Sequence, residues 1–268
     1  MKNIGDKLRT LRRDKQLLRA LTCKFLFHTG IGRFLTFKVQ GMRLRFFHSE
    51  MTYEAWKCPG RYRTEDAAFL EKVLRPGGLV VDVGANVGMI SIQAAKLIGP
   101  SGRVIAIEPN PRIAAFCKEN IELNRLDNVT VMQTALGEQV GTIGFNCDRC
   151  DDRSRVVNEG GTRVPLTTLD KIMEAHPKTV IDLLKIDVEG YELTVLGGAR
   201  EALRRTRWLY IEADAPNYAQ YGKSVKDVTA LLDTQGFDIF ISDEQGNWQE
   251  VNGALPESVN LIGRNRNN

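Results

Sequence analysis

Short apolar runs alternate with helix-like segments along most of the chain, from residue 79 onward. Seven of these runs predict strands, at residues 79–83, 103–107, 129–133, 180–186, 208–211, 237–242 and 259–262. Because the runs lack period-two alternation, both faces of the sheet must be covered, which is typical of a parallel α/β sheet. The last two runs lie close together and predict a final antiparallel hairpin. We therefore expect a doubly wound, mostly parallel sheet of seven strands within a domain over residues 64–268.

The first 63 residues differ from this domain in charge. They carry 15 Lys/Arg against 4 Asp/Glu, whereas the remainder carries 22 against 29. A partial leucine stripe predicts a basic helix over residues 2–20, and two short strands are expected at 34–39 and 42–47. This basic helical and hairpin extension could touch a membrane surface through residues 1–33, which would make the protein peripheral to the membrane. It could equally be a solvated face or pack on the main domain.

The first strand of the predicted sheet runs directly into a glycine-rich turn, VVDVGANVG, and then into a helix. Such a turn lets backbone N–H groups and a helix N-terminus face a ligand. The spacing is not the G-x-G-x-x-G of a dinucleotide site, because Asn86 stands where the second glycine would be. A sulfonium amino acid joined to a nucleoside fits better, with Asp82 near its ammonium group. The expected contacts in this turn are Asp82, Gly84, Ala85, Asn86 and Gly88.

The next two strands end in residues suited to the rest of such a ligand. The second strand ends in Glu108-Pro109-Asn110, twenty residues after Gly88. An acidic side chain at this place can accept hydrogen bonds from both ribose hydroxyls. The third strand ends before Thr134 and Ala135, where we expect the edge of the adenine.

The fourth strand carries a charged pair, Lys185 and Asp187, within the element LLKIDVEGYE. Residues two apart on a strand share one face, so the two side chains should lie together. Asp187 is expected at the carboxyl end, above the crevice. A structural ion pair and a catalytic role are both open, although burying such a pair is costly.

Several of these motifs together resemble the FkbM-type methyltransferases: VVDVGANVGMIS, AIEPNP, TLD, and LLKIDVEGYE followed by VLGGA. The resemblance covers roughly residues 50–245. It implies a class I methyltransferase (Rossmann-like) fold, S-adenosyl-L-methionine as the donor, and O-methylation of a sugar, glycolipid or natural-product hydroxyl. The donor contacts that it implies are Asp82, Gly84, Asn86, Gly88 and Glu108. It also marks, without assigning roles, Lys185, Asp187, Glu189 and Glu192.

A hydroxyl acceptor has to lose its proton during methyl transfer, and a carboxylate within hydrogen-bond reach can accept it. We expect Asp187 to be this base, with Lys185 holding Asp187 or stabilising the developing alkoxide. A variant uses Mg²⁺ held by Asp187 with Glu212 or Asp214, which end the fifth strand. Apart from this variant we expect no metal site, because Cys147 and Cys150 have no second pair.

Other functions stay open at this point. The basic N-terminus could bind RNA for ribose methylation, although nucleic acid is the less favoured partner. Attack by a base amine is disfavoured because no Asn/Asp-Pro-Pro-aromatic element ends the fourth strand. The fold could also serve as a non-catalytic binding module. Five cysteines without a disulfide-framework spacing, and an N-terminus unlike a secretory signal, indicate a cytoplasmic protein.

Overall fold

The fold was analysed in a computed structural model of the chain. It describes residues 17–26, 28–47, 50–58, 64–147, 155–157, 160–242, 247–251 and 255–267. Most of the predicted basic helix over residues 2–20 therefore lies outside the described residues. No helix in the described ranges is both long and apolar enough to cross a membrane.

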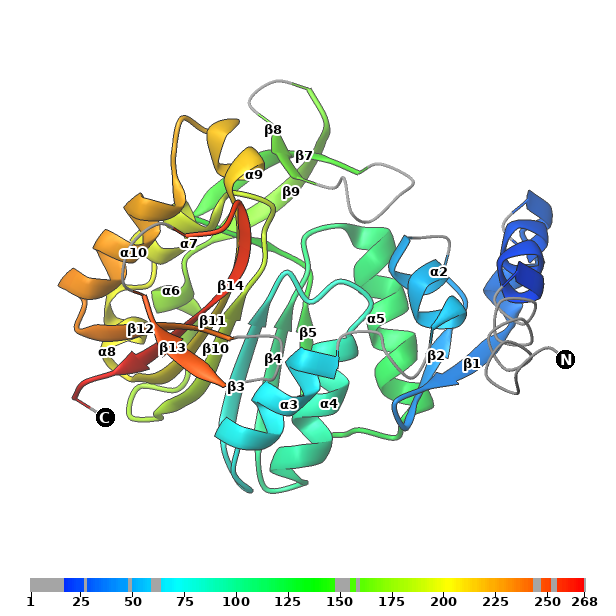
Figure 1. Cartoon of the computed structure of the whole chain (residues 1–268), viewed down its shortest axis with the longest axis horizontal. Helices are drawn as coiled ribbons and strands as arrows, with labels where there is room; N and C mark the ends of the chain where they lie inside the picture. Colours follow the sequence, from blue (N-terminus) through cyan, green and yellow to red (C-terminus); the bar gives the residue numbers. More distant parts are fainter. Residues whose placement is uncertain are drawn as a thin grey trace, which may run out of the picture.

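A large, mostly parallel sheet forms the centre of the molecule (Figure 1). Across it, the strands run in the order β13 (Trp248–Glu250), β12 (Phe237–Ser242), β14 (Ser258–Asn265), β11 (Thr206–Asp214), β10 (Ile181–Ile186), β3 (Leu79–Val83), β4 (Arg103–Ile107) and β5 (Val129–Met132). The strands from β11 to β5 are parallel, and β14 is antiparallel to both β11 and β12. The predicted doubly wound α/β fold and its final antiparallel hairpin are confirmed.

Helices cover both faces of this sheet (Figure 1). One face carries α3 (Thr64–Val73), α4 (Met89–Ile98) and α5 (Pro111–Leu123). The other carries α6 (Leu169–Met173), α7 (Glu192–Gly197), α8 (Arg200–Arg204) and α10 (Val225–Thr234). The inner strands are buried on both faces by these helices, which explains their continuous apolar runs. A capping box of Ser224 and Asp227 starts α10.

A second, smaller sheet is inserted between β5 and α6. Its order is β6 (Ala135–Leu136), β9 (Thr162–Thr167), β7 (Gly141–Asn146) and β8 (Arg155–Val157). The side chains of Phe145, Val156 and Val164 pack together in its own apolar cluster. This sheet lies beyond the carboxyl ends of the central strands (Figure 1).

The N-terminal part packs against α4 and α5. Residues 17–26 are helical, and η1 (Ile31–Phe34), β1 (Thr36–Val39), β2 (Met42–Arg45) and α2 (Glu50–Lys57) follow. The predicted hairpin of β1 and β2 is confirmed. Asn120 of α5 ties it to the domain, because its Oδ1 accepts from the N–H of Arg45 at 2.6 Å while its Nδ2 donates to the Val87 carbonyl at 2.8 Å.

The sequence prediction missed one strand of the main sheet. This eighth strand, β13, lies in the connection from β12 to β14 along the chain, and it pairs with β12 at the edge of the sheet. Residues 192–204 form two helices, α7 and α8, rather than one. The break falls at Gly198, where a Cβ would come within 1.9 Å of the Gly137 carbonyl oxygen. The connection after β7 contains β8, and β9 follows it.

Candidate functional site

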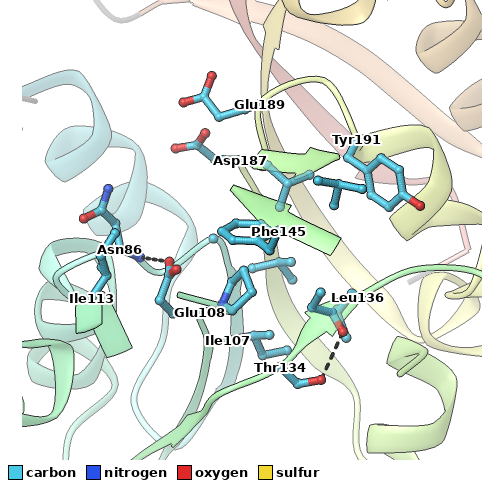
Figure 2. A pocket seen from close by; sticks show the side chains of 16 residues that line it. Asn86, Ile107, Glu108, Ile113, Thr134, Leu136, Phe145, Asp187, Glu189 and Tyr191 are labelled. Carbon is cyan, nitrogen blue, oxygen red and sulfur yellow. Dashed lines mark hydrogen bonds between the residues drawn. The ribbon is translucent and has the colours of Figure 1, made fainter. Parts of the chain in front are cut away.

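A pocket of about 660 Å³, counted with its open mouth, lies at the carboxyl ends of β3, β4 and β10. The chain passes from β3 outward to β4 and β5 and then returns to β10 on the other side of β3. Ligands of open α/β sheets bind at such a switch point. Figure 2 shows the Asp187 and Glu189 carboxylates on one wall, Asn86 and Glu108 on another, and Phe145 between them.

The glycine turn approaches β10 so closely that no side chain fits. Gly84 has φ of 73°, and a Cβ there would lie 1.8 Å from the carbonyl oxygen of Asp187. Gly88 has φ of 88°, and its Cβ would meet Sγ of Cys117 at 2.9 Å. Both positions therefore require glycine. The N–H groups of Gly84 and Ala85 both donate to the carbonyl of Ile107, at 2.9 and 3.0 Å, which joins the turn to β4.

Glu108 links the glycine turn to the start of α5. Its Oε2 accepts from the N–H of Asn86 at 3.0 Å, and its Oε1 accepts from the N–H of Asn110 at 2.9 Å. Asn86 itself has φ of 50°, an uncommon conformation for a residue other than glycine. Burial raises the pKa of Glu108 to about 7, and the two backbone hydrogen bonds oppose this shift. A buried carboxylate is thus held at the wall of the pocket.

Lys185 joins two carboxylates beneath the turn. Its Nζ lies 3.3 Å from Oδ1 of Asp82 and 3.5 Å from Oδ2 of Asp187. It also donates to the carbonyl oxygen of Gly84 at 2.8 Å. Asp82 is fully buried, and its Oδ2 accepts from the Ser91 hydroxyl at 2.6 Å. The shared face predicted for Lys185 and Asp187 is confirmed, and Lys185 lies below the pocket rather than at its wall.

The segment after β10 presents two carboxylates to the pocket, Asp187 and Glu189. Glu189 has φ of 55°, so its backbone is held in the left-handed region. Its Oε2 accepts from Nδ2 of Asn217 at 2.6 Å. Burial, together with the smaller effect of the charges of Asp187, Glu212 and Glu192, raises the pKa of Glu189 to about 8.

Glu192 and a small helix keep this segment in place. Oε1 of Glu192 accepts from the N–H groups of Val188 at 3.0 Å and Gly190 at 3.2 Å. The short helix α9 (Ala215–Ala219) packs on Gly190 so closely that a Cβ there would lie 2.5 Å from the Asn217 carbonyl oxygen. Glu192, which the sequence marked without a role, therefore holds the turn rather than lining the pocket.

The remaining wall is mostly apolar. It includes Thr134 and Ala135 after β5, and the small sheet contributes Phe145 and Val156. The hydroxyl of Thr134 donates to the backbone carbonyls of Ala135 and Pro165, each at 3.1 Å. Tyr191 closes the far end (Figure 2).

The structure brings most of the residues singled out from the sequence to this one pocket. Those that line it are Gly84, Asn86, Glu108, Pro109, Thr134, Ala135 and Asp187. Those that lie behind or beneath the lining are Asp82, Ala85, Gly88, Asn110 and Lys185. Asn110 instead caps α5, accepting from the N–H groups of Arg112 and Ile113.

Glu212 is the candidate that the structure does not bring to the pocket wall. It lines a separate groove beside α3, together with Tyr210 and Trp248. Asp214, the other carboxylate of the magnesium variant, caps α9 by accepting from the N–H of Asn217. Among the described residues, no three or more His, Cys, Asp or Glu side chains are grouped as a metal site.

Sequence reasoning gave no role to Glu189 and overlooked the side chains of Phe145, Val156 and Tyr191. Glu189 could have been identified as a pocket residue from the sequence, because it stands two residues beyond Asp187 and directly before a glycine. The aromatic and apolar wall could not be predicted from the sequence, since it depends on how the inserted small sheet packs over the pocket.

Comparison with known proteins agrees with this architecture. Residues 82–239 match the methyltransferase FkbM domain. The 2-O-methyltransferase NoeI of Sinorhizobium fredii is 27% identical over 158 residues, covering 52% of this chain and 64% of that protein. The hexuronic acid methyltransferase AglP of Haloferax volcanii is 29% identical over 153 residues, covering 56% and 59%. The chain thus spans about three fifths of the length of these two curated relatives.

Among solved structures, a SAM-dependent O-methyltransferase from Thermotoga maritima superposes with a TM-score of 0.46 and 15% identity, over 75% of this chain and 65% of that one. The family match, by contrast, extends from Asp82 at the glycine turn to Ile239 in β12 and so includes more than half of the chain. On that match, the chain belongs to the FkbM family of S-adenosylmethionine-dependent methyltransferases.

Proposed function

We propose that this protein transfers the methyl group of S-adenosylmethionine to a hydroxyl of a sugar, a glycolipid or a related natural product. The observation that carries this proposal is a pair of carboxylates, Asp187 and Glu189, on the pocket wall that faces the glycine turn and Glu108. The names of two relatives, a 2-O-methyltransferase and a hexuronic acid methyltransferase, support an oxygen acceptor on a carbohydrate.

The residues at the pocket suit the donor. Gly84 and Gly88 leave a backbone cradle that a Cβ would disrupt, and the backbone N–H of the adjoining Asn86 donates a hydrogen bond to the Glu108 carboxylate. We propose that Glu108 binds the ribose hydroxyls and that the glycine turn faces the amino-acid part of the donor. Thr134 and Ala135 would border the adenine. Asp82 is fully buried, so we propose that it supports the turn through Lys185 instead of meeting the ammonium group directly.

The bound donor would supply an activated methyl group, and much of the catalysis would then be the positioning of the acceptor. The chain's own task is to accept the proton of the attacking hydroxyl. We propose Asp187 as the group that accepts it, with Lys185 as a positioning residue. The ammonium of Lys185 lies 3.5 Å from the Asp187 carboxylate but is buried below the pocket, which favours holding Asp187 over stabilising an alkoxide.

Glu189 extends this proposal. Its carboxyl has a pKa raised to about 8 by burial and by neighbouring charges, which brings it close to neutral pH, where a base works best. We propose that Glu189 shares the acceptor's proton with Asp187 or receives it from that residue. The apolar wall of Phe145 and Val156 would exclude water from the same space.

The magnesium variant gains no support from the arrangement of carboxylates. Asp214 uses Oδ1 as a helix cap, and Glu212 lines the groove beside α3. We therefore assign no metal-dependent step to Asp187.

Two measurements test the proposal. Titration calorimetry with S-adenosylhomocysteine should detect binding to the native chain, and Glu108→Ala should weaken it by about tenfold or more, as expected for a lost charge-assisted hydrogen-bond pair. Transfer of a radiolabelled methyl group would then be followed with panels of monosaccharides, glycolipids and RNA. Labelled carbohydrate is expected; label in RNA alone would refute the proposed acceptor class.

Variants of the two carboxylates separate binding from chemistry. Asp187→Asn and Glu189→Gln should each lower turnover by about 10²-fold or more while S-adenosylhomocysteine still binds. Glu174→Gln, at an exposed position in the turn after α6, is the matched control and should behave as the native chain does. Full turnover in Asp187→Asn would rule out the proposed base.

A further inference from the structure

The N-terminal part exposes an unusual share of the protein's large apolar side chains. Of the nine such side chains exposed in the described ranges, seven lie between residues 17 and 35, each between 42% and 66% exposed. We name these seven the N-terminal apolar patch. Its members are Leu17, Leu18, Leu21, Phe25, Ile31, Phe34 and Leu35. Soluble monomers rarely gather exposed apolar side chains in this way without a partner.

The helix that carries the first four members is docked on the protein. Its inward side chains Cys23 and Leu26 are buried in the cluster that includes β1, β2 and α4. Arg19 and Trp56 also bond to each other's backbone carbonyls, at 3.3 and 3.2 Å. The helix stands at the periphery of the molecule, away from the central sheet (Figure 1). The four members on this helix therefore lie on its exposed side, opposite the buried Cys23 and Leu26, while Ile31 and Phe34 line a groove beside α5.

The charged side chains of the segment that carries the patch have one sign. Residues 17–47 contain six Lys and Arg and no Asp or Glu. Of these cations, Arg19, Lys24, Arg33, Lys38 and Arg43 are exposed. The guanidinium of Arg33 lies 4.7 Å from the ring centre of Phe34, inside the patch itself. A second copy of this surface would bring like charges together, whereas an anionic surface would be attracted.

We propose that the N-terminal apolar patch binds the surface of a bilayer that contains anionic lipids. The leucine and phenylalanine side chains would enter the boundary between headgroups and acyl chains, and the surrounding lysines and arginines would pair with lipid phosphates. The interaction would be peripheral and would weaken with salt, because part of it is electrostatic. It does not depend on the methyl-transfer proposal.

Vesicle co-sedimentation of the full chain tests this. Vesicles of phosphatidylcholine with one quarter phosphatidylglycerol should retain the protein at low salt, and pure phosphatidylcholine should retain it at least tenfold less. Leu18→Gln with Phe25→Gln, and separately Lys24→Gln with Arg33→Gln, should each lower the binding constant at least tenfold. Val140→Gln is the matched control, because Val140 is 66% exposed but lies outside the patch. Thermal melting would establish that every variant is folded.

The alternative occupants give different results. If the patch joined two copies of the chain, light scattering would show a dimer that Leu18→Gln with Phe25→Gln dissociates, and vesicle binding would not respond; this overturns the proposal. A chain that lacks residues 1–16 could lose all vesicle binding while the patch variants still bind. Lipid binding would then belong to residues 1–16, and the proposal would be overturned. Equal retention of the native chain and the patch variants on anionic vesicles would also overturn the proposal.

Discussion

The side-chain amide of Asn217 donates a 2.6 Å hydrogen bond to Oε2 of Glu189, from a helix that follows a different strand. Asn217 is itself fixed, because its N–H donates to the Asp214 side chain at 3.1 Å. Its carbonyl lies against Gly190 so closely that only glycine fits there. The carboxylate facing the pocket is thus oriented by the end of β11, although it belongs to the loop after β10.

Replacing Asn217 with alanine should move the pH dependence of the reaction. Its hydrogen bond favours the ionised form and so lowers the pKa of Glu189; without it the pKa rises. The ascending limb of kcat/KM against pH should therefore shift upward by about one pH unit. The profile of the Asn217→Ala variant would be compared with that of Lys226→Ala, an exposed change on α10. A fall in rate with no shift of the limb would reduce Asn217 to a purely structural role.

Removing the charge of Lys185 should destabilise the fold strongly. Lys185→Met would leave Asp82, which is fully buried, without its ionic partner. Breaking one side of a buried pair costs about 3–5 kcal/mol of unfolding free energy, measurable by urea denaturation. Lys171→Met removes an exposed pair with Glu174 and should cost no more than about 1 kcal/mol. Equal stability of the two variants would contradict the structural role of Lys185.

The elements that rest on local signals were predictable. The apolar run over Leu79–Val83 formed the expected strand, because a continuous apolar run by itself indicates a strand buried on both faces. The edge strand β13 was not predictable, since it is held by pairing with β12 rather than by its own three residues. Glu212 was placed near Asp187 from strand order. It lines the groove beside α3 instead of the pocket, and that depends on the local course of β11.

The pocket residues also divide into those that local sequence predicted and those that depend on long-range packing. Gly84 and Glu108 were identified because their types and spacing carry the chemistry. Asp82 was expected to face the ligand, yet its oxygens face Ser91 and Lys185. Only the packed arrangement reveals that the lysine two residues before Asp187 reaches back under the turn. Long-range contacts of this kind leave no local pattern in a single sequence.

Adding one methyl group at Gly84 should prevent folding of the turn. The Cβ of Gly84→Ala would lie 1.8 Å from a backbone oxygen, at φ of 73°. Neither strand end can move without breaking the sheet, so we expect a loss of about 3 kcal/mol or more and no binding of S-adenosylhomocysteine. Gly141→Ala is the control, since nothing lies within 4 Å of its added Cβ, and its stability should change by less than about 1 kcal/mol. Native-like melting of Gly84→Ala would show that the turn lies farther from β10.

Two glutamates at the pocket wall, Glu108 and Glu189, should make the protein less stable as the pH rises from about 5 to 8. Burial raises the pKa of Glu108 to about 7 and that of Glu189 to about 8, from an ordinary value of 4.5. Between these limits the folded chain binds more protons than the unfolded chain, so the free energy of unfolding falls with increasing pH. Each unit of pKa difference corresponds to about 1.4 kcal/mol of unfolding free energy.

Urea denaturation at pH 5 and pH 8.5 should show this loss of stability in the native chain. The loss should be clearly smaller in the double variant Glu108→Gln with Glu189→Gln. Glu201→Gln, an exposed change in α8, should keep the native slope. If the double variant kept it too, the two carboxyls would already be ionised at pH 5, and Glu189 would lose the property that suits it to accept a proton near neutral pH.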